Sequence, residues 1–315
     1  MVWLLWAYTT WVTNWADPDR IPVRLLLLGL MLVSLAMSAA LPEAFGRSGL
    51  IVGGGYALMQ VGRSLFAVWA LRGALRRNFQ RIACWCCVSG ALALAGGLAG
   101  AGPREVLWLA AVAVDLLGGV VGFYVPGLGR SLTQEWDIEG GHFAERCQAF
   151  ILIALGESVV VIGATLAGLL DGPLATPHAN AGPAIAAFVI AFAGSAGLWW
   201  LYFDRSAEAG AAAIAESADP GALGRTACHL IHPVMVAGII VAATADEVVL
   251  SHPQGHAGTA GALLILGGPA LYIAGHAAFK AVVLAGLAAA VVVGVAGADY
   301  ATRDGAEPPG RAEEA

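Results

Sequence analysis

The sequence predicts an all-α, polytopic membrane helix bundle, and three observations support this fold class. Of the 315 residues, 59% are hydrophobic and only 12% are charged, whereas about 25% are charged in a typical soluble domain. The mean hydropathy is +0.76. Apolar stretches of about 20 residues, long enough to cross a bilayer, recur along the chain. The lipid bilayer is therefore the first expected partner, and nucleic acid is disfavoured as a ligand.

Apolar windows bounded by Pro, Gly and charge clusters predict ten membrane-spanning helices. They are expected at residues 2–16, 23–42, 49–71, 80–100, 105–125, 144–170, 183–204, 226–247, 260–279 and 281–298, the last two joined by a tight turn at Lys280. We expect a single transmembrane domain over residues 1–300, with a first half at 1–125 and a second half at 144–298. The polar, acidic tail at 301–315 is expected to be disordered.

Lys and Arg residues predict the orientation of this bundle. When the loops are assigned alternately to the two sides, eleven of the 16 Lys and Arg residues fall on one side. Short loops rich in Lys and Arg mark the cytoplasmic face of a membrane protein. The richer side, which includes the loops before residues 23 and 80, is therefore predicted to be cytoplasmic.

The five cysteines show neither CxxC spacing nor a histidine at ligand distance. We interpret them as buried thiols that pack as small apolar side chains. No cofactor-binding motif is present, and the sequence predicts neither a cofactor nor a metal site.

One internal repeat is visible between two predicted helices. The segment "GGYALMQVGRSLFAVWAL" (54–71) aligns without gaps to "GGPALYIAGHAAFKAVVL" (267–284), with seven identical residues. The two segments lie six predicted helices apart and run in the same direction. Parallel repeats of six helices are typical of transporters. Arg63 and His276 fall at equivalent positions of the repeat.

The segment "HFAERCQAFILIALGESVVVIG" (142–163) holds Glu157 near the middle of an apolar helix. An acid at that depth is costly in lipid and normally faces the interior of a bundle. We expect Glu157 either to bind an ion or proton in a central cavity or to hydrogen-bond to a neighbouring helix. His142, Glu145 and Arg146 are expected to form a motif at the cytoplasmic mouth, as a gate or as an interfacial anchor.

A second set of ionisable residues lies in the segment "CHLIHPVMVAGIIVAATADE" (228–247). His229 and His232 stand three residues apart on one helical face, and Asp246 lies near the opposite end. A proton relay is favoured over zinc, because a zinc site would need further ligands from other helices. Pro233 is expected to break or kink the helix at this point.

Basic and acidic residues inside other predicted helices complete the candidate site. Arg63 and His276 could contact an anion or headgroup, or pair with Glu157, Asp115 or Asp204; His276 could also only mark the interface. Asp115 lies deep in its predicted helix, whereas Asp204 is expected to cap a helix end.

The segment 142–163, followed by "LWWLYFD" and "GGPALYIAGH", resembles the low temperature requirement protein A family of bacterial membrane proteins. The resemblance extends over essentially the whole chain. It implies a multi-pass protein of the bacterial plasma membrane, and it implies no substrate or catalytic residue. Members of that family usually begin with a helix bearing an "ELFFDLVFV"-type motif, which this sequence lacks. We therefore expect the chain to begin after a lost first helix.

These observations favour a small-solute or ion permease that uses buried ionisable residues. A membrane-embedded enzyme, a lipid-handling protein and a structural membrane factor without transport are the alternatives. Catalysis is disfavoured because the nearest nucleophile and acid, Ser158 and Glu157, are adjacent in sequence and face apart on a helix.

Overall fold

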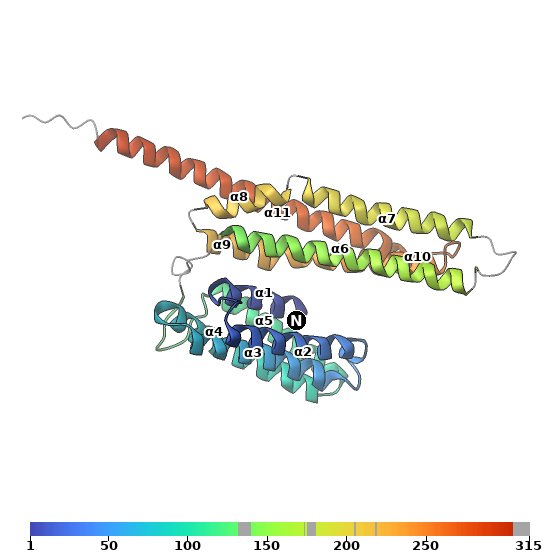
Figure 1. Ribbon diagram of the computed structural model, residues 1–315, viewed down its shortest axis with the longest axis horizontal. Coiled ribbons are helices and arrows are strands. Elements are labelled where there is room, and N and C mark those ends of the chain that lie inside the picture. The colour runs from blue at the N-terminus through green and yellow to red at the C-terminus, as the bar shows by residue number, and fades with distance from the viewer. Residues whose placement is uncertain (132–139, 173, 175–180, 205, 218, 305–315) are drawn as a thin grey trace, which may run out of the picture. The chain divides into compact units, whose positions relative to one another are not determined.

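The computed structural model describes residues 1–131, 140–172, 174, 181–204, 206–217 and 219–304. The chain divides into two compact units, an N-terminal unit, Met1–Phe143, and a C-terminal unit, Ala144–Ala315. Helices make up all long elements of the described residues (Figure 1). The expectation of two similar halves stays a prediction.

Five α-helices lie entirely within the described residues of the N-terminal unit. They are α1 (Val2–Trp15), α2 (Ile21–Ala40), α3 (Gly49–Ala70), α4 (Gly73–Leu98) and α5 (Ala101–Val120), with a short 3-10 turn, η1 (Leu41–Glu43), after α2. α3 packs against α1, α2 and α4, and α4 packs against α5. Glycines allow α3 and α4 to approach closely, because a Cβ on Gly53 would lie 2.2 Å from the Ala93 carbonyl oxygen. α3 therefore lies in the interior of this unit.

Arg104 at the start of α5 holds together two loops of the N-terminal unit. Its guanidinium donates hydrogen bonds to the carbonyl oxygens of Ala44 (3.0 Å), Gly46 (2.6 Å), Gly96 (3.1 Å) and Ala99 (2.8 Å). Carbonyl oxygens at helix ends and in loops lack helical N–H donors, and the buried Arg104 guanidinium provides these donors. The loop before α3 is in this way fixed to the end of α4.

The C-terminal unit contains longer helices and one π-helical segment. Its elements are α6 (Gly140–Asp171), α7 (Gly182–Phe203), α8 (Ser206–Glu216), α9 (Pro220–Gly224), the π-helical η3 (Arg225–Ile231), α10 (His232–Ser251) and α11 (Gly258–Asp304). Glycines again allow close helix packing, here between α10 and α11. A Cβ on Gly268 would lie 2.5 Å from the backbone nitrogen of Ala242, and one on Gly238 would lie 2.5 Å from that of Tyr272.

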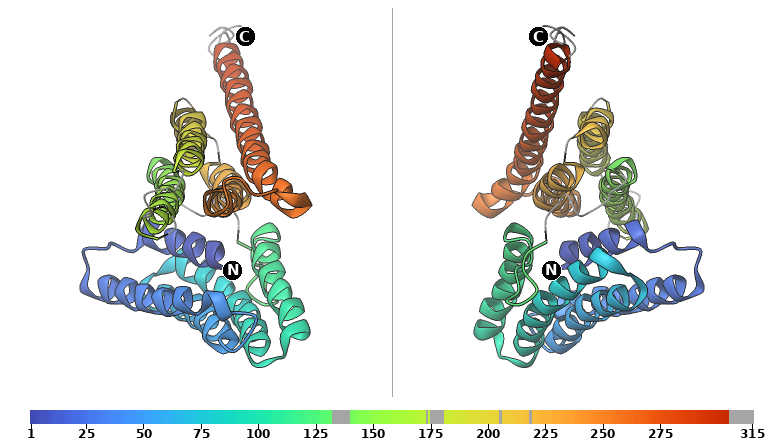
Figure 2. Two further views of the ribbon diagram at one scale, coloured as in Figure 1. Left: turned by 90° about the vertical axis from the view of Figure 1, so that its right-hand side faces the viewer. Right: turned by 90° about the vertical axis from the view of Figure 1, so that its left-hand side faces the viewer.

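The last helix differs from the sequence prediction. α11 is one continuous helix, drawn orange to red in Figures 1 and 2, and it passes through Lys280 where a turn was expected. The residues around Lys280 are mostly Ala, Val and Leu, and Lys itself is a good helix former, so nothing in this stretch ends a helix. α11 also includes residues 301–304 of the expected disordered tail, whose remaining residues, 305–315, lie outside the described residues.

Six helical segments of the described residues are long and apolar enough to cross a membrane. They are Ile21–Glu43, Gly73–Leu98, Ala144–Asp171, Gly182–Glu216, Pro220–Ser251 and Gly258–Ala289. α2 exposes Leu25, Leu28, Leu32 and Leu35 on one face, as expected for a helix in contact with lipid. The fold class is thus confirmed as an all-α multi-pass membrane protein. The number of ten spans stays a prediction.

Candidate functional site

The N-terminal unit contains a buried polar network made of Tyr56, Gln60, Arg63 and Asp115. The first three share one face of α3 through their spacing of four and three residues, and Asp115 comes from α5. The Tyr56 hydroxyl donates a hydrogen bond to Asp115 Oδ2, and Gln60 Nε2 donates to the same oxygen at 2.6 Å. Gln60 Oε1 in turn accepts a hydrogen bond from Arg63. The network therefore joins a carboxyl and a guanidinium through an amide.

The Arg63 guanidinium also contacts α1. It donates to the carbonyl oxygen of Leu5 at 3.1 Å and to the hydroxyl of Thr9 at 3.2 Å. Its central carbon lies 5.3 Å from the ring centroid of Tyr8, in cation–π geometry. Arg63 is only 1% exposed. Side-chain and backbone groups of α1 and α3 thus surround the Arg63 guanidinium.

Arg63 and Asp115 are linked through Gln60, and no direct ion pair between them is found among the described residues. Two buried atoms of the network, Asp115 Oδ1 and Arg63 Nε, have no hydrogen-bond partner among the described residues. A buried polar atom without a partner is uncommon and marks a position that could bind a proton, an ion or water.

The C-terminal unit brings His232 and His276 together around Tyr202, in a cluster we call the His–Tyr cluster. His232 Nδ1 lies 2.7 Å from the carbonyl oxygen of Ala227, so that nitrogen carries the proton. In the neutral ring, Nε2 is then the acceptor, and the Tyr202 hydroxyl donates to it at 2.8 Å. His276 Nε2 lies 3.0 Å from the hydroxyl of Ser206. Aromatic contact with Phe279 completes the cluster.

The π-helical segment η3 ends directly before His232 and Pro233. Proline has no backbone N–H, so it cannot donate to the carbonyl oxygen four residues earlier, and the helix is disturbed there. The backbone N–H of His232 bonds instead to Ala227, five residues back, and the His232 ring donates to the same carbonyl. His229 lies half-buried within η3. Both ring nitrogens of His232 are thus occupied in holding this segment, which favours a structural role over a relay.

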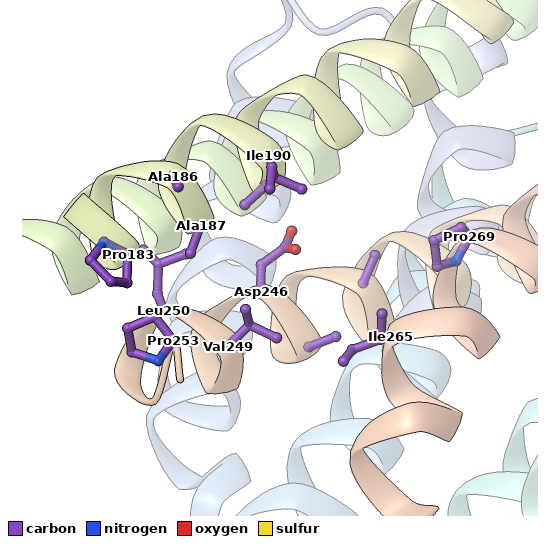
Figure 3. Close-up of a pocket in the computed structure, with 13 residues that line it drawn as sticks. Pro183, Ala186, Ala187, Ile190, Asp246, Val249, Leu250, Pro253, Ile265 and Pro269 are labelled. Carbon is purple, nitrogen blue, oxygen red and sulfur yellow. The ribbon is translucent and has the colours of Figure 1, made fainter. Parts of the chain in front are cut away.

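Asp246 lies about 21 Å from His232 along the axis of α10, at 1.5 Å per residue, and belongs to a separate pocket. This pocket has a volume of about 400 Å³ between α7, α10 and α11. Figure 3 shows the Asp246 carboxylate projecting from α10 toward α7, among apolar side chains. Apart from Glu157, the residues predicted for the transport site are therefore divided among three places: the polar network of the N-terminal unit, the region of η3 and the His–Tyr cluster, and the Asp246 pocket.

Glu157 differs from the expectation, because its side chain is exposed on the C-terminal unit instead of lying in its interior. The buried face of α6 carries Ile151, Leu155, Ser158 and Ile162. Glu157 precedes Ser158 by one residue, and one helical residue turns the side chain by about 100°. Ser158 accordingly bonds to Ser195 on α7 at 3.2 Å, not to Glu157. The role of Glu157 as an ion or proton ligand stays a prediction.

The motif expected at the cytoplasmic mouth lies in the first turns of α6. Glu145 is exposed and Arg146 is half-buried, and both have interactions within the protein. His142 belongs to the same helix, and its side chain lies outside what the structure describes. Among the described residues, no group of three His, Cys, Asp or Glu side chains is arranged to hold a metal ion.

The sequence interpretation missed Tyr56, Gln60 and Tyr202, the residues that connect the charged or basic side chains. A signal was present for Gln60, a polar residue inside an otherwise apolar helix and three residues before Arg63. Tyr56 precedes Gln60 by four residues on the same face. For Tyr202 the aromatic run at residues 199–203 concealed the signal, because such runs usually mark the membrane interface.

These features define a multi-pass membrane protein with buried ionisable residues. A family model described as the bacterial low temperature requirement A protein (LtrA) matches residues 1–303, and the chain belongs to this family. It is 36% identical over 277 residues to the "Uncharacterized protein RA0937" of Rhizobium meliloti (strain 1021). The alignment covers 87% of this chain and 66% of that relative. No solved structure matches this chain.

Proposed function

We propose that this LtrA-family protein is a permease of the bacterial plasma membrane that moves a small solute or ion and couples this movement to protons. The observation that carries the proposal is the buried Asp115 carboxyl, which has one hydrogen-bonded oxygen and one oxygen without a partner among the described residues. Ionisable residues inside membrane bundles commonly mark ion paths or proton relays. The predicted two-half architecture is part of this proposal.

The geometry of Asp115 lets it gain and lose a proton without disturbing its neighbours. Both donors, Tyr56 and Gln60, bind Oδ2. Oδ1 accepts no hydrogen bond within the part of the chain that the structure describes, so a proton can be added there without breaking the bonds to Oδ2. The buried Ser89 hydroxyl of α4 lies near the same carboxyl. The network can thus persist in both protonation states, as a reversible proton carrier requires.

Because Arg63 is charged, protonation of Asp115 changes the net charge of the network. When Asp115 is ionised, the network is neutral overall, because the Arg63 charge is balanced through Gln60. When Asp115 is protonated, the buried guanidinium is uncompensated, and a buried unbalanced charge is costly. A proton entering this unit therefore raises the free energy of the unit unless another charge moves. This is a physical basis for coupling.

Asp115→Asn is the variant that tests the proposal. The carboxamide oxygen of the variant can accept from Tyr56 and Gln60, and its amide nitrogen takes the place of the unpartnered oxygen, so the fold should be preserved. We expect the variant to reduce solute-dependent proton movement to the level of empty liposomes. The measurement uses purified protein in liposomes loaded with a pH-sensitive dye, with an imposed pH gradient and a panel of amines, amino acids, organic acids and metal ions.

The matched control is Asp19→Asn, which removes an exposed carboxylate from a loop of the same unit. It should leave proton movement at the wild-type level. Wild-type proton movement in the Asp115→Asn liposomes, with intact folding, contradicts the assignment of Asp115. Failure of every solute in the panel to move with the wild-type protein contradicts the permease.

A further inference from the structure

The pocket between α7, α10 and α11 has an unusual chemical composition. Twelve of its thirteen lining residues are Ala, Pro, Ile, Val or Leu, and the remaining one is Asp246. A volume of about 400 Å³ is within the range of small-ligand sites, roughly 300 to 1,000 Å³. Such sites combine apolar walls with a few polar groups that fix orientation. Here the only polar side chain in the described lining is an acceptor when ionised.

A backbone carbonyl adds a second acceptor to this pocket. Pro269 lies inside α11 and lines the pocket together with Ile265, four residues earlier. Because proline has no N–H, the Ile265 carbonyl oxygen lacks its usual helical donor. Interrupted helices in transporters use freed carbonyls of this kind to bind cationic ligands. Asp246 thus supplies one oxygen acceptor, and helix geometry directs the freed Ile265 carbonyl toward Pro269 on the same lining face of α11. None of the described lining side chains is a donor.

We propose that this pocket binds a small primary organic ammonium ion, with its apolar body between α7 and α11 and its N–H groups directed to Asp246 and the Ile265 carbonyl. The interpretation of this pocket as the substrate site rests on the proposed permease function. The ammonium supplies both the positive charge and the donors that the lining lacks. The aliphatic walls cover the hydrocarbon part of the ligand.

The same lining disfavours other ligand classes. Sugars and carboxylic acids need hydrogen-bond donors, and none of the described lining side chains is one. Quaternary ammonium ions are typically held by aromatic rings, and the described lining contains no aromatic residue. A bare metal ion needs more oxygen ligands than one carboxylate and one carbonyl supply.

The pocket lies at the end of its helices that is predicted to face outside. Pro183 is near the start of α7, and Pro253 follows the end of α10. The Lys and Arg distribution predicts that these ends are extracytoplasmic. The site is therefore expected to be loaded from outside the cell.

Equilibrium binding in lipid nanodiscs tests the inference directly. The probes are cyclohexylammonium and cyclohexanol, which share one ring and differ in charge. We expect the wild-type protein to bind cyclohexylammonium at least about tenfold more tightly than the alcohol, because an ionised pair of hydrogen-bonding groups contributes more than a neutral one. Asp246→Asn should weaken ammonium binding by about tenfold or more and leave alcohol binding unchanged.

Three further variants control this result. Glu247→Gln removes the exposed neighbouring acid on α10 and should bind as the wild type does. Ala187→Leu fills the pocket and should weaken both probes. Pro269→Ala restores an N–H donor for the Ile265 carbonyl and should weaken ammonium binding several-fold.

Two outcomes overturn the inference. One is ammonium binding by Asp246→Asn within about twofold of wild type, and the other is equal binding of alcohol and ammonium by the wild-type protein. Ammonium binding that depends on Asp246 without any flux in liposomes leaves the binding site established and contradicts the permease. Flux of other solutes without ammonium binding supports the permease and contradicts the ammonium site.

Discussion

The polar network of the N-terminal unit and the His–Tyr cluster of the C-terminal unit differ in how they stabilise buried polar side chains. Arg63 and His276 align in the proposed repeat, and both are buried. Arg63 is permanently charged and is balanced through Gln60 by Asp115. His232 and His276 are instead held by hydroxyl and carbonyl groups. One unit buries an acid and a base that are linked through an amide, whereas the other buries histidines that are linked to hydroxyl and carbonyl groups.

This difference favours a functional role for the polar network and a structural role for the His–Tyr cluster. A buried charge is costly to keep, so its retention favours a role in handling ions. A neutral histidine with both ring nitrogens occupied mainly fixes geometry, as His232 does for η3. Variants that remove one group from each cluster can sharpen or break this comparison.

Arg63→Met should have the largest effect. It leaves the Asp115 carboxylate buried without its balancing charge, which typically costs about 3 to 5 kcal/mol of unfolding free energy. The measurement is equilibrium unfolding in mixed detergent micelles. The double variant Arg63→Met with Asp115→Asn removes both charges and should be more stable than Arg63→Met alone. A double variant that is less stable than Arg63→Met would show that the two groups do not balance each other.

Tyr202→Phe should have an intermediate effect. It removes the donor to His232 Nε2 and leaves that buried acceptor unsatisfied, at a cost of about 1 to 3 kcal/mol. The same unfolding measurement applies. Tyr272→Phe, which removes a donor to the Leu198 carbonyl on α7, is the matched control for loss of a hydroxyl. If Tyr202→Phe lowers the free energy of unfolding as much as Arg63→Met does, the expected contrast between the two clusters is contradicted.

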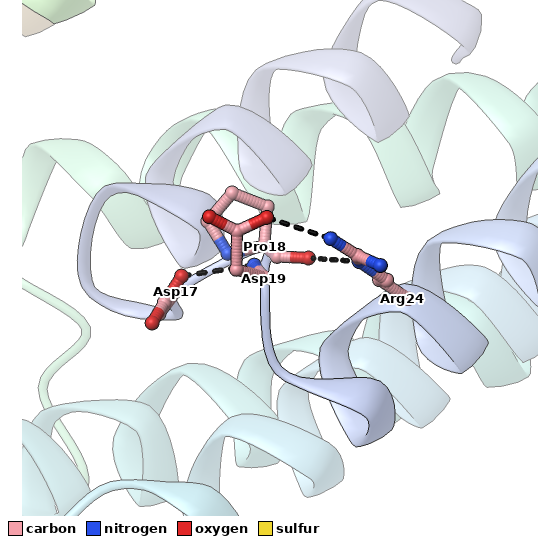
Figure 4. Close-up of polar contacts among 4 residues, drawn as sticks. All are labelled: Asp17, Pro18, Asp19 and Arg24. Carbon is pink, nitrogen blue, oxygen red and sulfur yellow. Dashed lines mark hydrogen bonds and ion pairs between the residues drawn. The ribbon is translucent and has the colours of Figure 1, made fainter.

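Asp19→Asn should have the smallest effect. Asp19, in the loop before α2, pairs with Arg24 in the first turn of α2 at 2.7 Å (Figure 4), and their side chains are 85% and 59% exposed. Arg24 also donates to the Pro18 carbonyl oxygen, a contact that the variant keeps. Exposed ion pairs contribute about 0 to 1 kcal/mol because water and salt screen them. A change above that range would show that exposure does not explain the ranking of the three variants.

The sequence predicted the fold class, because this depends on composition and on helical periodicity. It placed Asp115 correctly inside a helix, and the structure buries its side chain. It could not predict which helix faces which, so the partners of Arg63 remained open among three acids. Gln60 as the intermediary could be found only from the packing of α3 against α5 and α1.

Two differences have local physical causes. The sequence expectation for Glu157 relied on the cost of an acid in lipid and did not fix which face of α6 is buried. In the structure, the buried face of α6 is the one that carries Ile151, Leu155 and Ile162. The turn expected at Lys280 rested on one charge, and a single lysine in an Ala- and Val-rich stretch does not end a helix.

Arg104 bears on how the chain acquires its orientation. It is one of the few arginines on the predicted extracytoplasmic side, which by itself would oppose the positive-inside bias. Its charge is engaged by four carbonyl oxygens, so it is not available to anionic phospholipid headgroups. Two of these acceptors, Gly96 and Ala99, lie at the end of α4, so the hairpin of α4 and α5 by itself supplies half of the carbonyl groups that solvate this guanidinium.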